Sequence, residues 1–202
     1  MPISNKYNCI FVHIPKTAGT SIESVFGMHG DRLNVGIKPY LNQKSDYDNL
    51  FGNNLQHLTA FEIKSKIQNY SDFYKFSFVR NPWDKFVSVT LWEGPKTKVN
   101  KNMSKDQFKK KALNKMKFAK LHYMPQVDYI FHSGSLLVDF VGKFENLEED
   151  FQKVCDSLNV NFKLEYRMKV DHKPYQEYYN QEMIDFVSDF YSKDIEYFGY
   201  DF

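Results

Sequence analysis

Residues 11–26, with the sequence FVHIPKTAGTSIESVF, bring together groups that bind anions. An apolar run ends at Val12, and from Thr20 onwards apolar residues recur at helical spacing, which predicts a strand, a tight turn and a helix. Such a turn directs unpaired backbone N–H groups and the positive end of a helix dipole towards one point. We therefore expect the turn to hold an anion.

Six consecutive residues of this turn are the candidate ligands: Lys16, Thr17, Ala18, Gly19, Thr20 and Ser21. Lys16 would supply positive charge, Gly19 would let the backbone approach the anion, and the hydroxyl groups would add donors. The order differs from the usual P-loop, in which the glycine-rich stretch precedes Lys-Ser/Thr, because Lys16 here comes before Gly19. A purely structural turn with an exposed lysine is the alternative.

A second segment, FVRNPWDKFVSV, repeats the strand, turn and helix pattern. Arg80 follows a predicted strand at residues 73–79, and Ser88 lies on the helix that Asn81 and Pro82 begin. Parallel strands place their carboxyl ends at one edge of a sheet, where α/β proteins bind ligands, so Arg80 should lie near the first turn. One ligand could then carry two anionic groups. The alternative is a plain helix start with Arg80 in a surface ion pair.

These turns must be positioned by a sheet and its covering helices. Further helices are predicted from two capping boxes and two amphipathic runs: Thr59 with Glu62, Ser104 with Gln107, and residues 146–158 and 180–191. The run VDYIFHSGSLLVDFVG predicts two strands around a turn at residues 132–135. Strands separated by helices predict a three-layer α/β, P-loop-like fold with a mainly parallel central sheet flanked by helices.

Length and composition predict one compact domain over residues 1–202, with 42% hydrophobic residues for its core. Residues 28–56 have weak periodicity and predict a long loop region. No run of about 18 apolar residues is present, so we expect no membrane span and a soluble, cytoplasmic protein. Cys9 and Cys155 are expected to be buried reduced thiols. No Cys/His/Asp group has metal-ligand spacing, so we expect no metal.

The chain resembles a known family at the two turns, FVHIPKTAGTSIE and FSFVRNPWDKFVSV. They are similar to those of the carbohydrate sulfotransferases of the Golgi type, in the heparan 2-O-sulfotransferase-like branch. These enzymes use 3′-phosphoadenosine 5′-phosphosulfate (PAPS). The segments PQVDYIF, LLVDFVGKFENLEEDF and HKPYQEYYNQEMIDFVSDFYSKDIEYFGYDF are also similar, so the resemblance spans nearly the whole chain. Golgi members carry a membrane anchor and often disulfides, and here we expect a short soluble form with neither.

The resemblance implies a role for each site residue. Residues 16–21 would bind the 5′-phosphosulfate, and Arg80 and Ser88 the 3′-phosphate. The segment QHLTAFEI is similar to the histidine segment that reaches the acceptor, which makes His57 the general base for the acceptor hydroxyl. Lys16 would stabilise the leaving phosphate oxygen. A helix-start histidine with a local hydrogen bond is the alternative for His57.

Other residues are candidates for supporting roles. Lys173, in the segment DHKPY, is a candidate contact with the nucleotide. His13 is interpreted as a core histidine or as a residue that orients the first turn. Trp83 and Trp92 occupy helical positions and are expected in the core rather than in a ligand platform.

The positive charge of the chain is concentrated in one segment. Residues 96–120 carry ten lysines against Asp106, a local charge of +9, which leaves −7 for the rest of a chain with net charge +2. The segment is either a solvated helix face or the lining of a cleft for an anionic acceptor. A nucleic-acid partner is not expected, because the only aromatic residues among these lysines are Phe108 and Phe118.

The resemblance therefore implies the transfer of a sulfuryl group from PAPS, without a metal, to a hydroxyl of a carbohydrate, which could be an anionic glycan. A P-loop kinase with Asp139 as a magnesium ligand is one alternative, although Phe140 and Val141 continue an apolar run and place Asp139 within a strand. A non-catalytic module that binds PAPS or anionic glycans is the other.

Overall fold

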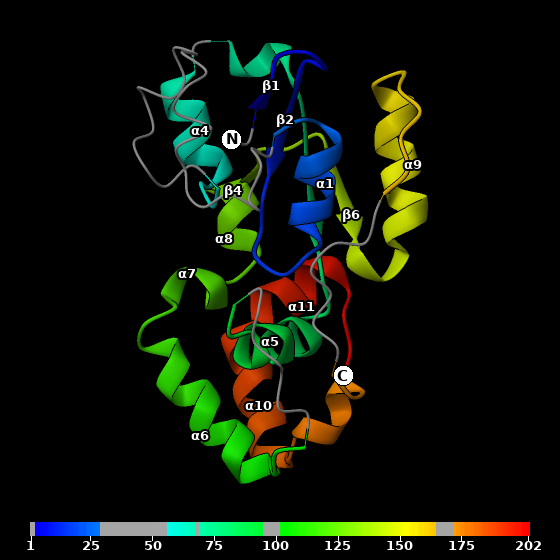
Figure 1. Ribbon diagram of the computed structural model, residues 1–202. Helices are drawn as coiled ribbons and strands as arrows, with labels where there is room; N and C mark the ends of the chain where they lie inside the picture. Colours follow the sequence, from blue (N-terminus) through cyan, green and yellow to red (C-terminus); the bar gives the residue numbers. More distant parts are fainter. Residues whose placement is uncertain (1–2, 29–55, 68, 95–101, 165–171) are drawn as a thin grey trace.

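The computed structural model describes residues 3–28, 56–67, 69–94, 102–164 and 172–202 (Figure 1). Within them lies a central sheet in the order β1-β2-β3-β6. Its strands are β1 (Ile3–Ser4), β2 (Cys9–Val12), β3 (Tyr74–Val79) and β6 (Phe140–Lys143). The pairs β2–β3 and β3–β6 are parallel and β1 is antiparallel, which confirms the mainly parallel sheet.

One face of the sheet is covered by α1 (Gly19–Val25) and α9 (Leu147–Ser157) (Figure 1). Their apolar side chains pack with those of β2 and β3 in a core that contains Phe11, Phe26 and Phe151. Cys9 and Cys155 lie in this core as buried free thiols, as expected. Burial raises the pKa of Cys9 to about 12, so its thiol is inert at neutral pH.

The opposite face is covered by α4 (Ala60–Lys66) and α8 (Val127–Ile130) (Figure 1). The predicted capping box is confirmed, because Thr59 Oγ1 accepts from the backbone N–H of Glu62 and the Glu62 carboxylate accepts from the N–H of Thr59. The turn η2 (Tyr70–Asp72) then leads into β3.

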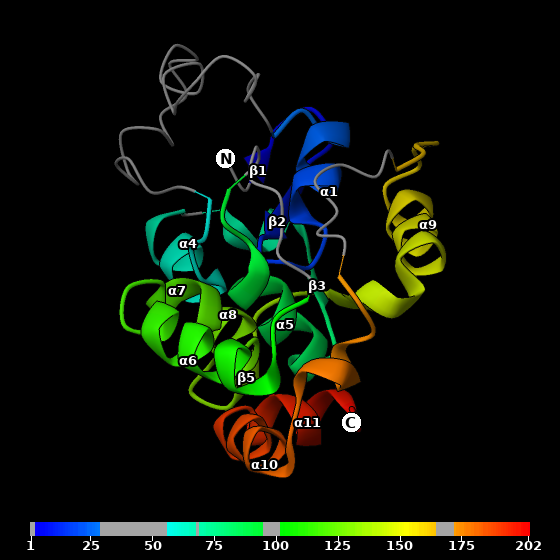
Figure 2. The same ribbon diagram turned by 60° about the horizontal axis from the view of Figure 1, so that its bottom comes forward.

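A second group of helices packs below the carboxyl ends of the strands, as Figures 1 and 2 show. It contains α5 (Pro82–Leu91), α6 (Lys105–Met116), α7 (Lys120–Tyr123), η4 (Tyr175–Tyr178), α10 (Gln181–Phe190) and α11 (Ser192–Phe198). Its core includes Trp83, Phe86, Phe108 and Tyr191. The predicted helix starts at Asn81 and Ser104 are confirmed, since both side chains accept from backbone N–H groups.

One predicted strand is wrong. Residues 127–130 form α8, and the two short strands β4 (Phe131–His132) and β5 (Ser135–Leu136) make a separate hairpin before β6. The cause is distant in sequence: the buried Asp194 carboxylate accepts from the N–H groups of Gln126 and Val127 and so satisfies the start of a helix.

Three further findings complete the description of the fold. The turn η3 (Phe144–Asn146) precedes α9, close to the predicted start of that helix. The predicted loop at residues 28–56 lies almost wholly outside the described residues. Among the described residues, no helix is both long enough and apolar enough to cross a bilayer.

Candidate active site

The Lys16 turn is held in an unusual backbone conformation. Lys16 and Ala18 have φ angles of 70° and 66°, in the left-handed region that residues with a side chain seldom adopt. Thr17 is buried, and its hydroxyl donates to the Ile14 carbonyl at 2.8 Å. The Thr17 hydroxyl therefore closes the turn and is engaged within the protein. Strain of this kind is retained where the surroundings impose it, often at ligand sites.

Gly19 is required for a reason that differs from the expectation. A Cβ atom at this position would lie 2.1 Å from Nε2 of His13, so only glycine lets the His13 ring pack against the start of α1. His13 Nδ1 lies 2.8 Å from the carboxylate of buried Glu23, and the Gln56 side-chain amide donates to the same carboxylate at 3.0 Å. His13 is thus a buried, hydrogen-bonded histidine that supports the turn, as interpreted.

Lys16 is a half-buried cation that has no carboxylate partner among the described residues. Burial, together with the positive charges of Arg80 and Lys115, lowers the pKa of Lys16 to about 7. The ammonium lies 5.1 Å from the centre of the Trp92 ring. An anion placed here would supply the missing counter-charge.

Arg80 lies beside this turn, as the parallel strands predict. Its Nη1 donates to the carbonyl of Lys16 at 3.1 Å, and its guanidinium pairs with Asp84 at 2.7 Å and stacks 4.1 Å from the centre of Phe144. The ion pair is largely buried rather than on the surface. Asp84 therefore fixes the direction of Arg80 and pairs with its charge, whereas Lys16 has no such partner among the described residues.

Ser88 follows Asp84 by one turn of α5, so the two residues lie on the same helix face. Ser88 is 1% exposed, and its hydroxyl makes no hydrogen bond to the described residues. A buried hydroxyl without a partner is costly, and a polar ligand that reached Ser88 would remove this cost.

The structure does not place the Lys173 side chain in the site. Its ammonium is 3.7 Å from the carboxylate of Glu177, and 42% of the side chain is exposed. The neighbouring His172 does reach the site, since its Nε2 lies 3.5 Å from both Arg80 Nη2 and Asp84 Oδ1. The sequence predicts Lys173 as the contact from this loop, whereas the structure brings His172 next to Arg80.

His57 is held on the connection that enters α4. Its Nδ1 lies 3.2 Å from the carbonyl of His13, to which it donates, so Nε2 carries the lone pair and can accept a proton. Burial, followed by the nearby His13, lowers the pKa of His57 to about 3. The ring is therefore neutral at physiological pH, and burial is the main cause.

His122 is a further residue of the site, and no sequence pattern predicted it there. His122 in α7 lies with its ring 5.4 Å from that of His57 and stacks on Trp92 at 5.6 Å. Burial and the charges of Lys16, Lys85 and Lys115 lower the pKa of His122 to about 4.

Trp92 was expected in the core, and that expectation is wrong, because the ring is half-buried between Lys16 and His122. Lys115 turns inward from the lysine-rich helix and donates to the carbonyls of Val89 and Trp92 at the end of α5. Trp83, by contrast, is buried in the core as expected.

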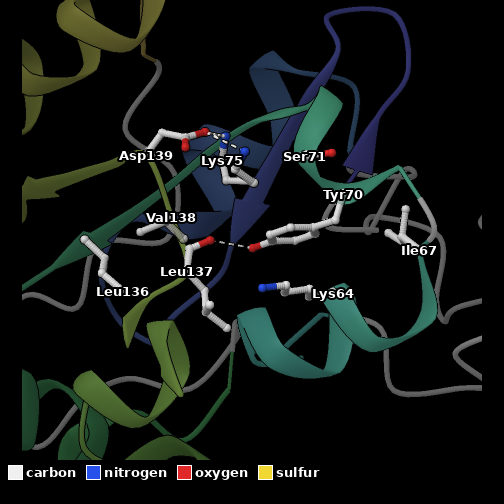
Figure 3. Close-up of a pocket in the computed structure, with 9 residues that line it drawn as sticks. All are labelled: Lys64, Ile67, Tyr70, Ser71, Lys75, Leu136, Leu137, Val138 and Asp139. Carbon is white, nitrogen blue, oxygen red and sulfur yellow. Dashed lines mark hydrogen bonds and ion pairs between the residues drawn. The ribbon is translucent and has the colours of Figure 1, made fainter. Parts of the chain in front are cut away.

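A hollow of about 430 Å³, separate from the candidate active site, lies at the amino ends of β3 and β6 (Figure 3). Asp139 lines it just before β6, where it accepts from the backbone N–H of Lys75 and pairs with the Lys75 ammonium at 2.9 Å. The expected position of Asp139 within a strand is therefore wrong. It lies at the amino ends of the parallel strands, away from the Lys16 turn, and so cannot hold a magnesium ion there.

Comparisons with known proteins identify the family of this chain. Residues 1–201 match the sulfotransferase family, and the chain therefore belongs to that family. A protein of Archaeoglobus fulgidus described as uncharacterized is 31% identical over 118 residues, which are 55% of this chain and 90% of that protein. No solved structure matches the chain. Family membership supports sulfuryl transfer in general. Among the described residues, no group of three or more His, Cys, Asp and Glu could hold a metal ion.

Proposed function

We propose that this protein transfers a sulfuryl group from PAPS to a hydroxyl of a carbohydrate, in a single P-loop-like domain over residues 1–202. The observation that carries the proposal is that Lys16, which has no carboxylate partner among the described residues, lies on the same wall of the site as a neutral imidazole, His57. The free nitrogen of His57 is defined by the bond from Nδ1 to the His13 carbonyl. Trp92 and His122 connect the two, since Trp92 contacts Lys16 and His122 contacts both Trp92 and His57.

The donor would lie across the carboxyl ends of β2 and β3. Residues 16–21 would bind its 5′-phosphosulfate through Lys16 and backbone N–H groups, and Arg80 with the Ser88 hydroxyl would bind its 3′-phosphate. Lys173, which is exposed, would contact the nucleotide from outside, while His172 would lie closer to the 3′-phosphate.

The chemistry follows from where charge and protons must move. As the bond between sulfur and the acceptor oxygen forms, the bond between sulfur and the phosphate oxygen of the donor breaks. Lys16 would stabilise the negative charge that develops on that phosphate oxygen, and Nε2 of His57 would take the proton of the acceptor hydroxyl. Anionic groups bound nearby favour imidazolium, so a bound donor raises the pKa of His57 from its low value in the free site.

The direct test is transfer of labelled sulfate from PAPS to a panel of glycans without added metal. We expect transfer by the wild-type protein and loss of transfer, with folding retained, in Lys16→Ala and His57→Ala. Binding of the product nucleotide without any transfer would instead support a non-catalytic binding module. Turnover of ATP that depends on magnesium, with no use of PAPS, would contradict the proposal in favour of a kinase.

A further inference from the structure

The outer side of α6 and α7 carries an unusual mixture of exposed side chains, which we call the basic–apolar surface. It consists of Lys110, Leu113, Lys117, Phe118, Lys120 and Leu121. Phe118 is 87% exposed, Leu121 47% and Leu113 39%. Phe108 and Ala112, on the other side of α6, are fully buried, so the helix is firmly anchored while this surface faces outward. Figures 1 and 2 both show α6 and α7 at the outside of the molecule.

The lysines of α6 and its flanks divide into two groups. Lys109 and Lys111 pair with Glu182 and Glu93, and Lys115 turns into the site. Those of the basic–apolar surface have no carboxylate partner among the described residues; Lys117 contacts only the Asn114 side chain, at 3.5 Å. This surface therefore carries positive charge that is not neutralised by a described residue.

The combination of charge and apolar area restricts the partner. A sulfated glycan or a nucleic acid would satisfy the lysines, but neither gives a dry environment to a phenylalanine and two leucines together. The interface of an anionic bilayer does both, because its headgroups attract lysine and its acyl boundary accepts aromatic and aliphatic side chains. We propose that the basic–apolar surface docks on anionic lipid membranes, with Phe118 and Leu121 inserted below the headgroups.

Docking in this way would leave the site accessible. Lys115 and His122 come from the same segment but turn towards Trp92 and are not among the exposed residues of this surface. Membrane binding and sulfuryl transfer are therefore separable properties of α6 and α7, and the test below does not depend on the proposed reaction.

The test is co-sedimentation of the full chain with vesicles of phosphatidylcholine, with and without phosphatidylglycerol. We expect binding only when phosphatidylglycerol is present, weakening as salt is raised. The double variant Lys117→Glu/Lys120→Glu should reduce vesicle affinity by about tenfold or more, and Phe118→Ser should reduce it by a similar amount. Lys64→Glu and Phe61→Ser, exposed positions on α4, are the matched controls and should bind like the wild type.

A second measurement separates insertion from simple charge attraction. In Phe118→Trp, the emission of the added indole should shift to the blue when phosphatidylglycerol vesicles are added, and should not shift with a sulfated polysaccharide. Absence of vesicle binding by the wild type would overturn the proposal. So would binding that depends on the lysines but not on Phe118, with no shift, because the surface would then be an electrostatic site for soluble polyanions.

Discussion

Lys16 should report anion binding through its protonation. Its pKa of about 7 means that at pH 8 the ligand-free amine is mostly neutral, and a bound phosphate raises that pKa. Binding of 3′-phosphoadenosine 5′-phosphate at pH 8 should therefore take up about one proton. Calorimetry in buffers of different ionisation enthalpy measures this uptake. Lys16→Met should abolish it, and at pH 5.5 Lys16 should contribute none. A wild-type protein without uptake at pH 8 would show that Lys16 does not contact the anion.

A second prediction at the scale of single residues concerns His57. His57→Ala should lower kcat by about 10²–10⁴-fold, the usual scale for a general base, while the affinity for the product nucleotide stays near wild type. Because the pKa of His57 in the ligand-free protein is about 3, His57 should produce no acidic limb between pH 5 and 8 in kcat/KM for the donor, PAPS. His132→Asn, an exposed histidine that stacks on Phe61, is the control and should leave kcat unchanged. Retained kcat in His57→Ala would move the role to another residue.

At the scale of elements, α8 depends on a carboxylate from α11. Asp194 accepts from the N–H groups of Gln126 and Val127, and Gln126 in turn forms two hydrogen bonds with the backbone of Arg80, each at 2.8 Å. Burial raises the pKa of Asp194, and these backbone N–H groups oppose that rise. This chain of contacts fixes the end of β3, from which Arg80 projects.

Asp194→Ala should therefore destabilise the protein strongly. The substitution leaves two buried N–H groups without an acceptor, and each should lower the free energy of unfolding by about 1–3 kcal/mol. Urea unfolding should show a lower midpoint, and Asp194→Asn, which keeps one acceptor oxygen, should lose less. Asp189→Ala, at an exposed position of α10, is the matched control and should unfold like the wild type. An equal loss in both Ala variants would contradict this role.

At the scale of the whole molecule, the buried imidazoles predict how stability depends on pH. The pKa values of His57 and His122, about 3 and about 4, are below those of the unfolded chain, near 6.5. The unfolded state therefore binds more protons below pH 6.5, and stability should fall as the pH decreases from there towards 4. The double variant His57→Asn/His122→Asn should lose less of its Tm between pH 7 and pH 5 than the wild type. An identical loss would show that other groups control acid unfolding.

Local sequence was sufficient for much of the fold. The strand runs at β2 and β3, the cap at Asn81 and the capping boxes at Thr59 and Ser104 depend on residues close in sequence, and all were predicted correctly. The proximity of Arg80 to the Lys16 turn was also predictable, because parallel strands share a carboxyl edge. Family membership could likewise be predicted from the two turns.

The tertiary structure decided what depends on contacts between distant residues. The helix at α8 forms because Asp194, 67 residues after Val127, caps it, so a run with strand character became helical. Trp92, His122 and Lys115 entered the site only because α5, α6 and α7 pack together, and no local pattern distinguishes such residues from core. The low pKa of His57 arises from burial among those neighbours. Spacing along the chain determines local elements, whereas burial and electrostatic environment exist only once the elements have packed.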